Sequence, residues 1–538
     1  MLLGFFPSSH FIRPAVPVID RHGCFYFLPT FRTTVSQRPY RLSLMGQFIF
    51  DVDDAQQPLL TQALWPAAYL SGVEGVPWHT LSRLDGCRLT VRRDIDDSAK
   101  LFLPLPVNGH GISSLNTCSL RPRQQPYPLL LELARGSLYN VRNQSDAWAR
   151  SGLQLHDEFQ SLLDDATQHF LDASGTSIGW RQATHSLKAL ELLETASHRL
   201  SDEYSTQAIA YRKHRDTRLT TLMAAELPGN GGIPNHGDDY KSAFNSVAVR
   251  ISWKDIEPQF GGGDFSATDA TFDWASQQGL RVIAGPLIDF QADSLPDWVY
   301  LMEGQFHKLL DSANQYVERI VKRYKGRVQL WNPASGLNLP GRLRLSDEQV
   351  MQLASTLVQS VRRQDPQTPV IFSVDQPQGE YLAHHRDGLS PIHFADTLAR
   401  CGLGLAGLGV EMRLGYSDLG MPPRSSLAIG QVLDRWATLG LPLLLHFAVP
   451  ADITADPLAT RACDVIAADP NDTPEARQLE TASAILRVAL AKPFVHAIVW
   501  EGWDDTAPHT LPHAGLWGAS GARPLLRYFQ RIREELLT

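Results

Sequence analysis

Carboxylates, side-chain amides and aromatic rings gather where short apolar segments end in the C-terminal part of the chain. In sequence order the candidate residues are Asp289, Trp331, Asn332, Asn338, Asp375, Glu380, Glu411, Arg413, Tyr416, His446, Glu501, Trp503, Asp504 and Asp505. Carboxylates can act as general acids, general bases or nucleophiles. Together with amides and aromatic faces, they are also the groups that hold sugar hydroxyls and pyranose rings. The pattern therefore indicates a carbohydrate ligand.

From about residue 216, short apolar segments alternate with longer amphipathic ones, which is typical of a parallel barrel or a doubly wound sheet. The predicted strands are Leu219–Glu226, Ser246–Trp253, Arg281–Phe290, Val328–Asn332, Val370–Asp375, Leu408–Leu414, Leu441–Val449 and Val495–Trp500. The predicted helices are Ala267–Gln278, Gln305–Tyr324, Ser346–Arg363, His393–Arg400, Ser425–Leu439 and Pro474–Ala491. Eight strands favour a (β/α)8 (TIM) barrel over an open sheet, whose first turn would carry a glycine-rich phosphate loop. The Gly229–Gly232 segment has no such motif and is predicted to be an ordinary loop.

Functional groups of such barrels lie at the C-terminal ends of the strands. Glu411 ends the apolar run Leu408-Gly409-Val410, so we expect it at the floor of the barrel mouth, where it would contact a ligand. The structural alternative is that it only pairs with Arg413. The other candidates also have structural alternatives: helix caps for Asp375 and Glu380, turns for Asp504 and Asp505, core packing for Trp331 and Trp503, and a hydrogen-bonded position for His446.

The chain before the barrel divides by pattern into three parts. Residues 1–44 are predicted to be an extension or a disordered tail. Residues 45–126 contain strand-like segments, at Gln47–Val52, Cys87–Arg93 and Lys100–Val107, and predict a small β-sandwich. This sandwich is either a structural cap or a sugar-binding module that uses Trp65, Tyr69 and Trp78. Residues 127–215 have helical periodicity, at Leu129–Trp148, Asp157–Leu171 and Thr184–Arg215, and predict a helical connector to the barrel domain at 216–538.

Composition excludes several classes of partner. The net charge is −8 and no basic stripe is present, which argues against nucleic acid. No stretch reaches the ~18–20 apolar residues of a membrane span.

Five dispersed cysteines and a first segment without a charged n-region favour a cytoplasmic location. Because the sequence has no HxH, HExxH or CxxC motif, we expect neither a metal nor a cofactor. No feature of the sequence indicates an oligomeric state.

Several motifs are in the order and spacing of one enzyme family. They are Phe244-Asn245-Ser246-Val247 with Trp253 and Ile256-Glu257-Pro258, Asp264-Phe265-Ser266 to Ala275, Leu295-Pro296-Asp297-Trp298-Val299, Arg323-Tyr324-Lys325-Gly326-Arg327-Val328 with Trp331, and Leu433-Asp434-Arg435 with Leu439-Gly440-Leu441-Pro442. This set, which spans most of the barrel, resembles the glycoside hydrolase family 10 xylanases. The resemblance implies a (β/α)8 barrel whose mouth binds a β-linked glycan.

The catalytic positions depart from that family. Where it has the acid/base glutamate this chain has Gly336, and Phe447 takes the place of the nucleophile, give or take one residue. The Q-x-H pair of the sixth strand is matched by Glu411 and Arg413. A glycine and a phenylalanine can neither protonate a leaving oxygen nor attack an anomeric carbon. Relocated catalysis would need two of the remaining carboxylates, and the candidates are Glu411, Asp375, Glu380 and Glu501.

Two functions remain open. The first is a divergent glycosidase that binds, and slowly hydrolyses, O-glycosidic bonds of a xylan-like glycan with relocated carboxylates. The second is a non-catalytic carbohydrate-binding or scaffold pseudoenzyme. The loss of both family glutamates favours the second, and the many carboxylates at the mouth favour the first. The remaining candidates, Asp289, Trp331, Asn332, Asn338, Arg413, Tyr416, His446, Trp503, Asp504 and Asp505, are predicted to bind the substrate in either case.

Overall fold

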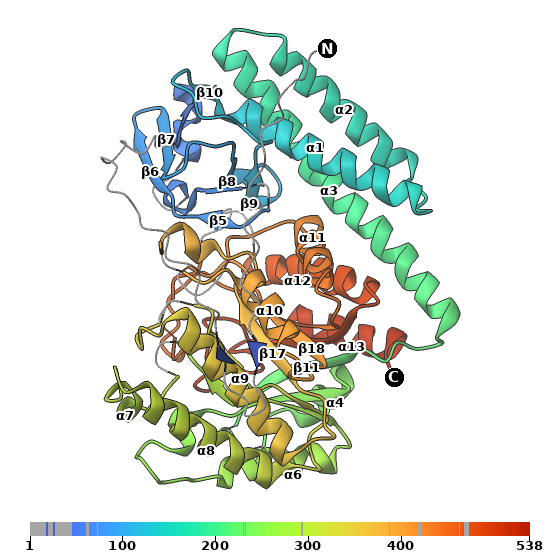
Figure 1. The fold of residues 1–538 in the computed structure, drawn as a ribbon. Helices are drawn as coiled ribbons and strands as arrows, with labels where there is room; N and C mark the ends of the chain where they lie inside the picture. Colours follow the sequence, from blue (N-terminus) through green and yellow to red (C-terminus); the bar gives the residue numbers. More distant parts are fainter. Residues whose placement is uncertain are drawn as a thin grey trace, which may run out of the picture. The chain divides into compact units, whose positions relative to one another are not determined.

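The computed structural model describes residues 18–19, 25–26, 46–60, 64–72, 74–229, 231, 233–291, 294–339, 341–386, 388–417, 421–461, 463–466 and 473–538. Met1–Ser43 and Leu44–Thr538 are separate compact units, and Figure 1 labels many of the helices and strands of the second. In the first unit, β1 (Val18–Ile19) pairs antiparallel with β2 (Phe25–Tyr26). Apart from these four residues, the predicted extension at 1–44 lies outside the described residues. No helix in the described ranges has both the length and the apolar character that crossing a bilayer requires.

Two four-stranded sheets follow in the described chain and enclose one apolar core, which confirms the predicted β-sandwich. One sheet contains β3 (Gly46–Asp51), β6 (Leu81–Asp85), β7 (Arg88–Arg93) and β10 (Tyr127–Pro128). The other contains β4 (Tyr69–Ser71), β5 (Pro77–Trp78), β8 (Lys100–Val107) and β9 (Gly111–Asn116). Alternate residues such as Leu89 and Val91 on β7 are buried, as expected for strands with one face on a core.

Three long helices connect the sandwich to the barrel: α1 (Leu129–Arg150), α2 (Asp157–Ser174) and α3 (Gly179–Arg215). They pack on one another through apolar residues at helical spacing, including Phe159 and Leu163 on α2 and Leu193 and Leu200 on α3. Helix α3 also contacts the barrel helix α12 (Pro474–Ala491). The division of Leu44–Thr538 into a sandwich, a connector and a barrel domain stays a prediction.

The predicted barrel is confirmed in the described residues as a parallel eight-stranded sheet. Its strands are β11 (Leu222–Pro228), β12 (Ser246–Arg250), β13 (Arg281–Ala284), β15 (Leu330–Trp331), β17 (Ile371–Asp375), β18 (Gly407–Arg413), β19 (Leu443–Ala448) and β20 (Val495–Trp500). A parallel bridge between Trp331 and Val370 brings the two ends of the sheet together. Besides α12, the predicted helices are present as α6 (Ser266–Gln277), α8 (Phe306–Tyr324), α9 (Asp347–Gln364), α10 (Pro391–Arg400) and α11 (Ser426–Ala437).

The structure differs from the predicted elements in two ways. The predicted strand Arg281–Phe290 is broken, and β14 (Ile288–Asp289) pairs separately with β16 (Ala334–Ser335). Pro286 lies at the break and has no N–H to donate to a ladder. The sequence patterns also missed α4 (Gly237–Ala243), α5 (Trp253–Ile256), α7 (Asp297–Tyr300) and the C-terminal helix α13 (Pro524–Leu536), which packs on α4 and α12.

The barrel interior has an apolar layer and a polar layer. The apolar layer contains Ala224, Ala248, Ile283, Ile371, Leu444, Ala497 and Val499. Nearer the C-terminal strand ends, alternate residues become charged, among them Glu411 and His446. Their neighbours Met412 and Phe447 belong to the outer core between strands and helices. Because successive side chains of a strand point to opposite faces, this alternation determines which residues reach the barrel mouth.

Candidate active site

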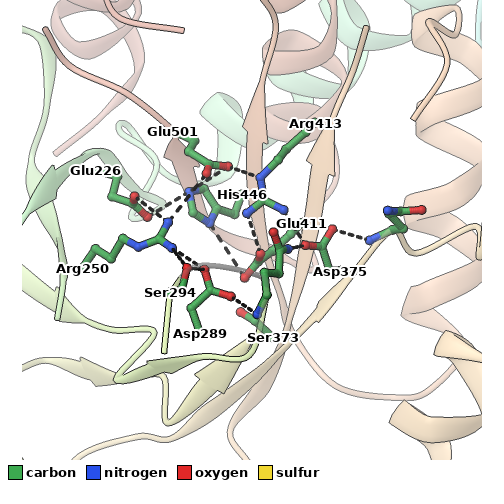
Figure 2. A network of polar contacts seen from close by, with 12 residues as sticks. Glu226, Arg250, Asp289, Ser294, Ser373, Asp375, Glu411, Arg413, His446 and Glu501 are labelled. Carbon is green, nitrogen blue, oxygen red and sulfur yellow. Dashed lines mark hydrogen bonds and ion pairs between the residues drawn. The ribbon is translucent and has the colours of Figure 1, made fainter. Parts of the chain in front are cut away.

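Charged side chains from most of the strands meet in one buried network at the C-terminal end of the barrel (Figure 2). We call it the mouth cluster, and it contains Glu226, Arg250, Asp289, Gln291, Ser294, Asp375, Glu411, Arg413, His446, Arg461 and Glu501. All eleven are largely shielded from solvent. Ionised groups in such a place must be paired and hydrogen-bonded, so the contacts within the cluster decide its chemistry.

Arg413 on β18 is bonded to three carboxylates. Its Nε donates to Glu501 Oε2 at 2.7 Å, its Nη2 to Glu411 Oε2 at 3.0 Å, and its Nη1 to Asp375 Oδ2. The guanidinium is 2% exposed, so solvent screens these ion pairs very little. Glu411 therefore does lie at the floor of the mouth, and it is also the partner of Arg413.

A second set of ion pairs surrounds Asp289, which follows the broken third strand. Its Oδ2 accepts from Nη2 of both Arg250 and Arg461. Arg461 comes from the long segment between β19 and α12, and its Nη1 also donates to Gln291 Oε1 at 2.5 Å. The amide of Gln291 in turn donates to Asp375. This chain of bonds links the two halves of the mouth cluster.

His446 on β19 lies among three glutamates. Its Nε2 is 3.4 Å from Glu226 Oε2 and 3.9 Å from Glu501 Oε2, and its Nδ1 is 4.0 Å from Glu411 Oε1. Nη1 of Arg250 lies 3.6 Å from Glu226 Oε1 and 3.9 Å from Glu501 Oε1. Glu226 and Glu501 thus have two neighbours in common, the guanidinium of Arg250 and the imidazole of His446 (Figure 2).

Negative charge exceeds positive charge in the cluster. Among the described residues it has five carboxylates and three guanidinium groups. Burial raises the pKa of Asp375 to about 7, although Arg413 opposes this, and it raises the pKa of Glu226 against Arg250 and His446. Burial also disfavours ionisation of Asp289 and Glu501. For these two carboxylates the neighbouring cationic side chains outweigh the effect of burial. Arg461 and Arg250 lower the pKa of Asp289, and Arg413 and His446 lower the pKa of Glu501. Burial thus favours the protonated forms of Asp375 and Glu226, whereas the neighbouring cations favour the ionised forms of Asp289 and Glu501.

A cavity of 350 Å³ reaches two of these carboxylates. We call it the strand-eight pocket, and Glu226, Asn235, Glu501, Trp503, Asp504 and His509 are among its lining residues. Within the described part of the chain, Glu226 Oε2 and Glu501 Oε1 have no hydrogen-bond partner. A larger cavity of 670 Å³ is lined by Gly336, Asn338 and loop residues, and by none of the five cluster carboxylates. The strand-eight pocket therefore gives a ligand access to Glu226 and Glu501 of the mouth cluster.

Six of the predicted site residues come together in the mouth cluster: Asp289, Asp375, Glu411, Arg413, His446 and Glu501. Asn332 and Asn338 lie beside it, because the amide of Asn332 donates to Ser373 Oγ at 2.9 Å and that of Asn338 to the carbonyl of Asp375 at 2.8 Å. Trp503 borders the strand-eight pocket, and its indole donates to the carbonyl of Asn235 at 2.9 Å.

Asp504 and Asp505 border the same pocket in a looped segment. Asp504 accepts from the Thr506 N–H at 2.8 Å, and Asp505 accepts from the Gly515 N–H at 2.8 Å and from Arg523 at 2.6 Å. At the pocket wall Asp504 thus makes a turn contact, and Asp505 makes a backbone contact and an ion pair. Of the two, Asp505 has the stronger structural role, since it holds a buried arginine.

Three predicted residues lie elsewhere. Trp331 is fully buried in the outer core, where its indole donates to Asp365 at 3.0 Å. The hydroxyl of Tyr416 donates to the carbonyl of Pro512 at 3.0 Å. Glu380 accepts from Arg424 at 2.7 Å, and Arg424 also donates to the hydroxyl of Tyr69 in the sandwich at 2.9 Å. Glu380 therefore joins the sandwich to the barrel, and Tyr69 is part of that contact.

The sequence patterns missed five residues of the mouth cluster: Glu226, Arg250, Gln291, Ser294 and Arg461. The strand-end rule that nominated Glu411 also applies to Glu226, which lies near the C-terminal end of β11, so a signal was present. Arg250 likewise ends β12. Gln291 and Arg461 lie in loops that return over the mouth, and no periodicity in the sequence marks them.

We predicted that Gly336 and Phe447 stand at the positions of the family's catalytic glutamates, and in the structure both predicted positions are closed to a glutamate that would reach the mouth. Gly336 has a φ of 73°, and a Cβ there would lie 2.9 Å from Cγ of Gln291 and 3.3 Å from Oδ1 of Asp289. Phe447 faces the outer core, where its ring packs edge-on against Trp500 at 5.1 Å. At this level of β19 the residue that faces the mouth is His446.

The raised pKa of Asp375 predicts how stability depends on pH. Between about pH 4 and 7 the folded state keeps a proton that the unfolded state has released, since an unfolded aspartate titrates near ~3.9. The free energy of unfolding should therefore fall as pH rises, by at most ~1.4 kcal/mol per pH unit from this group. Asp375→Asn cannot titrate and should lack this contribution.

Urea unfolding of the wild type and of Asp375→Asn at pH 5, 6, 7 and 8 measures the effect. The stability of the wild type relative to the variant should decrease from pH 5 to 7 and level off toward pH 8. Titrating groups outside the mouth cluster contribute equally to the stability of both proteins, so their contributions cancel when the two stabilities are subtracted. The buried Glu194, whose pKa burial raises to about 7, is one of them. Parallel curves for the two proteins would contradict the prediction.

Comparison with known proteins finds a family model and solved structures that are similar to this chain. The family model for glycosyl hydrolase family 10 matches residues 220–334, which contain β11 to β15, and this confirms the predicted resemblance to that family. Xylanase 10B from Thermotoga petrophila RKU-1, solved with xylobiose, is 17% identical, with 60% of this chain and 94% of that chain covered and a TM-score of 0.43. Xylanase 10B from Thermotoga maritima is 16% identical over 60% and 98% of the two chains, with a TM-score of 0.44.

Proposed function

We propose that this protein binds a β-linked, xylan-like glycan in the strand-eight pocket and does not cleave it by the double displacement of family 10. The observation that carries the proposal is a pocket of 350 Å³ bordered by Glu226 and Glu501, each with a buried oxygen that lacks a hydrogen-bond partner among the described residues. Pockets that hold small ligands have volumes of ~300–1,000 Å³. The family match at 220–334 supports a glycan as the ligand.

The wall of this pocket has the groups that a sugar requires. Glu501 offers a carboxylate oxygen to a hydroxyl donor, and the indole of Trp503 supplies an apolar surface, since its N–H already donates to the carbonyl of Asn235. Asp504 and His509 add polar groups at the rim. Direct bonds from hydroxyls to a buried ionised carboxylate are among the strong ones, at ~1.5–3 kcal/mol each.

Rapid hydrolysis is not supported by the same contacts. Asp375, Glu411 and Glu501 all accept hydrogen bonds from Arg413, and a carboxylate held by a guanidinium is a weak base and a weak nucleophile. The family positions at Gly336 and Phe447 supply no carboxylate. This favours binding over turnover.

A slow hydrolase is the second candidate, and one observation favours it. Glu226 and Glu501 share a pocket while their pKa values move in opposite directions, which is the arrangement of an acid and a base. In that reaction Glu226 would give its proton to the leaving glycosidic oxygen. Glu501 would take a proton from water as the water oxygen attacks the anomeric carbon, so that two hydroxyl products form.

Calorimetric titration with linear xylo-oligosaccharides tests the binding proposal. Glu501→Gln should weaken binding about tenfold or more, because it removes the charged acceptor in the pocket. Glu380→Gln is the matched control: it is also a buried glutamate that accepts from an arginine at 2.7 Å, but it lies outside the pocket. Absence of binding in the wild type, or equal loss in both variants, would refute the proposal.

Prolonged incubation of the same oligosaccharides, followed by product chromatography, tests the second candidate. Glu226→Gln should abolish any slow cleavage while binding stays nearly unchanged, since the amide retains hydrogen-bonding capacity but carries no acidic proton. Cleavage that persists in Glu226→Gln would exclude Glu226 as the acid.

A further inference from the structure

A second polar cluster lies far from the barrel mouth in sequence, on the hairpin formed by α2 and α3. His169 and Asp172 are three residues apart on α2 and therefore share one face of that helix. His185 lies on the neighbouring α3. The two helices are held together by apolar contacts that include Phe159, Leu163 and Leu200, so the backbone positions of the cluster are set independently of its polar groups.

The atoms of this cluster that can bind a metal face one another. Nδ1 of His169 lies 3.1 Å from Nδ1 of His185, and Oδ2 of Asp172 lies 4.0 Å from Nδ1 of His185. One ligand atom from each residue falls within 4.8 Å of the other two. Gln168 donates to Oδ1 of Asp172 at 2.9 Å, which leaves Oδ2 on the side of the histidines.

The distance between the two histidine nitrogens matches a zinc site, whereas the carboxylate of Asp172, at 4.0 Å, has to move closer to complete it. Zn–N bonds of ~2.0–2.1 Å at a tetrahedral angle place two nitrogen ligands about 3.3 Å apart. Two neutral imidazoles and one carboxylate carry a charge of −1, which complements a divalent cation. The side chains of His185 and Asp172 are 36% and 43% exposed, so an ion can enter and a water can complete four-coordination.

We propose that His169, Asp172 and His185 bind a Zn²⁺ ion that joins α2 to α3. Gln168 orients the carboxylate as an outer partner, in the way such partners usually orient metal ligands. Binding to the folded chain stabilises it, so the ion fastens the connector between the sandwich and the barrel.

Zinc titration of the untagged, chelator-treated full chain tests this site. One equivalent of Zn²⁺ should bind and raise the melting temperature. Loss of an outer partner of a metal ligand typically weakens metal binding ~10–100-fold. Because His185→Gln removes a ligand itself, it should weaken Zn²⁺ binding by at least this factor. Co²⁺ should give the strong visible absorption of a four-coordinate site in the wild type and lose it in His185→Gln.

His156→Gln is the control, because His156 belongs to the same hairpin but pairs with Glu203 at 3.0 Å, away from the cluster. Asp172→Asn covers the case in which His185→Gln fails to fold, since this half-exposed aspartate lies on the hairpin surface. The site is refuted if the wild type binds no zinc at micromolar concentration. It is equally refuted if the folded ligand variants bind zinc as tightly as His156→Gln does.

Discussion

Arg413→Met should destabilise the protein by ~3–5 kcal/mol, a large part of the stability of an ordinary domain. The reason is that Arg413 is bonded to Asp375, Glu411 and Glu501 in a place that solvent hardly reaches. Methionine fills much of the volume but removes the charge. The carboxylates would then lie buried without their main partner, and either they take up protons or the cluster opens to water.

Urea unfolding at pH 7 measures this loss. Arg83→Met serves as the control, since its ion pair with Asp85 is 78% and 75% exposed and such pairs contribute ~0–1 kcal/mol. A variant that combines Arg413→Met with Glu411→Gln and Glu501→Gln should recover part of the lost stability, because the amides carry no charge. If Arg413→Met were as stable as Arg83→Met, the mouth cluster would not be held by charge.

Installing glutamate at Gly336 should produce no xylanase turnover and should itself destabilise the barrel. Active glycosidases of ordinary efficiency turn over at ~1–10³ per second, and we expect both the wild type and Gly336→Glu to remain orders of magnitude below this. A Cβ at position 336 would lie 2.9 Å from Cγ of Gln291, and the residue has a φ of 73°. A glutamate there would have to displace Gln291, which connects Arg461 to Asp375.

Two alanine variants separate the causes of the instability. Gly336→Ala has both the positive φ and the close contact, whereas Gly440→Ala has a φ of 77° with open space around the added Cβ. Gly336→Ala should therefore lose clearly more stability than Gly440→Ala. Reducing-sugar release from xylan at ordinary xylanase rates, in the wild type or in Gly336→Glu, would contradict the closed site.

Local patterns in the sequence determined the elements of this protein. The eight strands and six of the helices of the barrel were predictable because a period of two or of 3.6 residues is encoded within a short segment. The same holds for Asp375, Glu411 and Glu501, since residues at the ends of parallel strands meet at one end of a barrel whatever the details of packing. The replacement at Gly336 stays a prediction, which rests on the spacing of the motifs that lead to that position.

Only the tertiary structure decided which of these residues act together. Register placed His446 in the mouth and Phe447 in the outer core, a difference of one residue that reverses the side a strand residue faces. Gln291 and Arg461 reach the mouth cluster from loops, whose course depends on distant packing and leaves no period in the sequence. Glu380 follows β17 and Glu411 lies near the C-terminal end of β18, yet Glu380 pairs with Arg424 beside Tyr69 of the sandwich. Its partner depends on the contact between sandwich and barrel, because a buried carboxylate takes whichever cation the folded chain brings within reach.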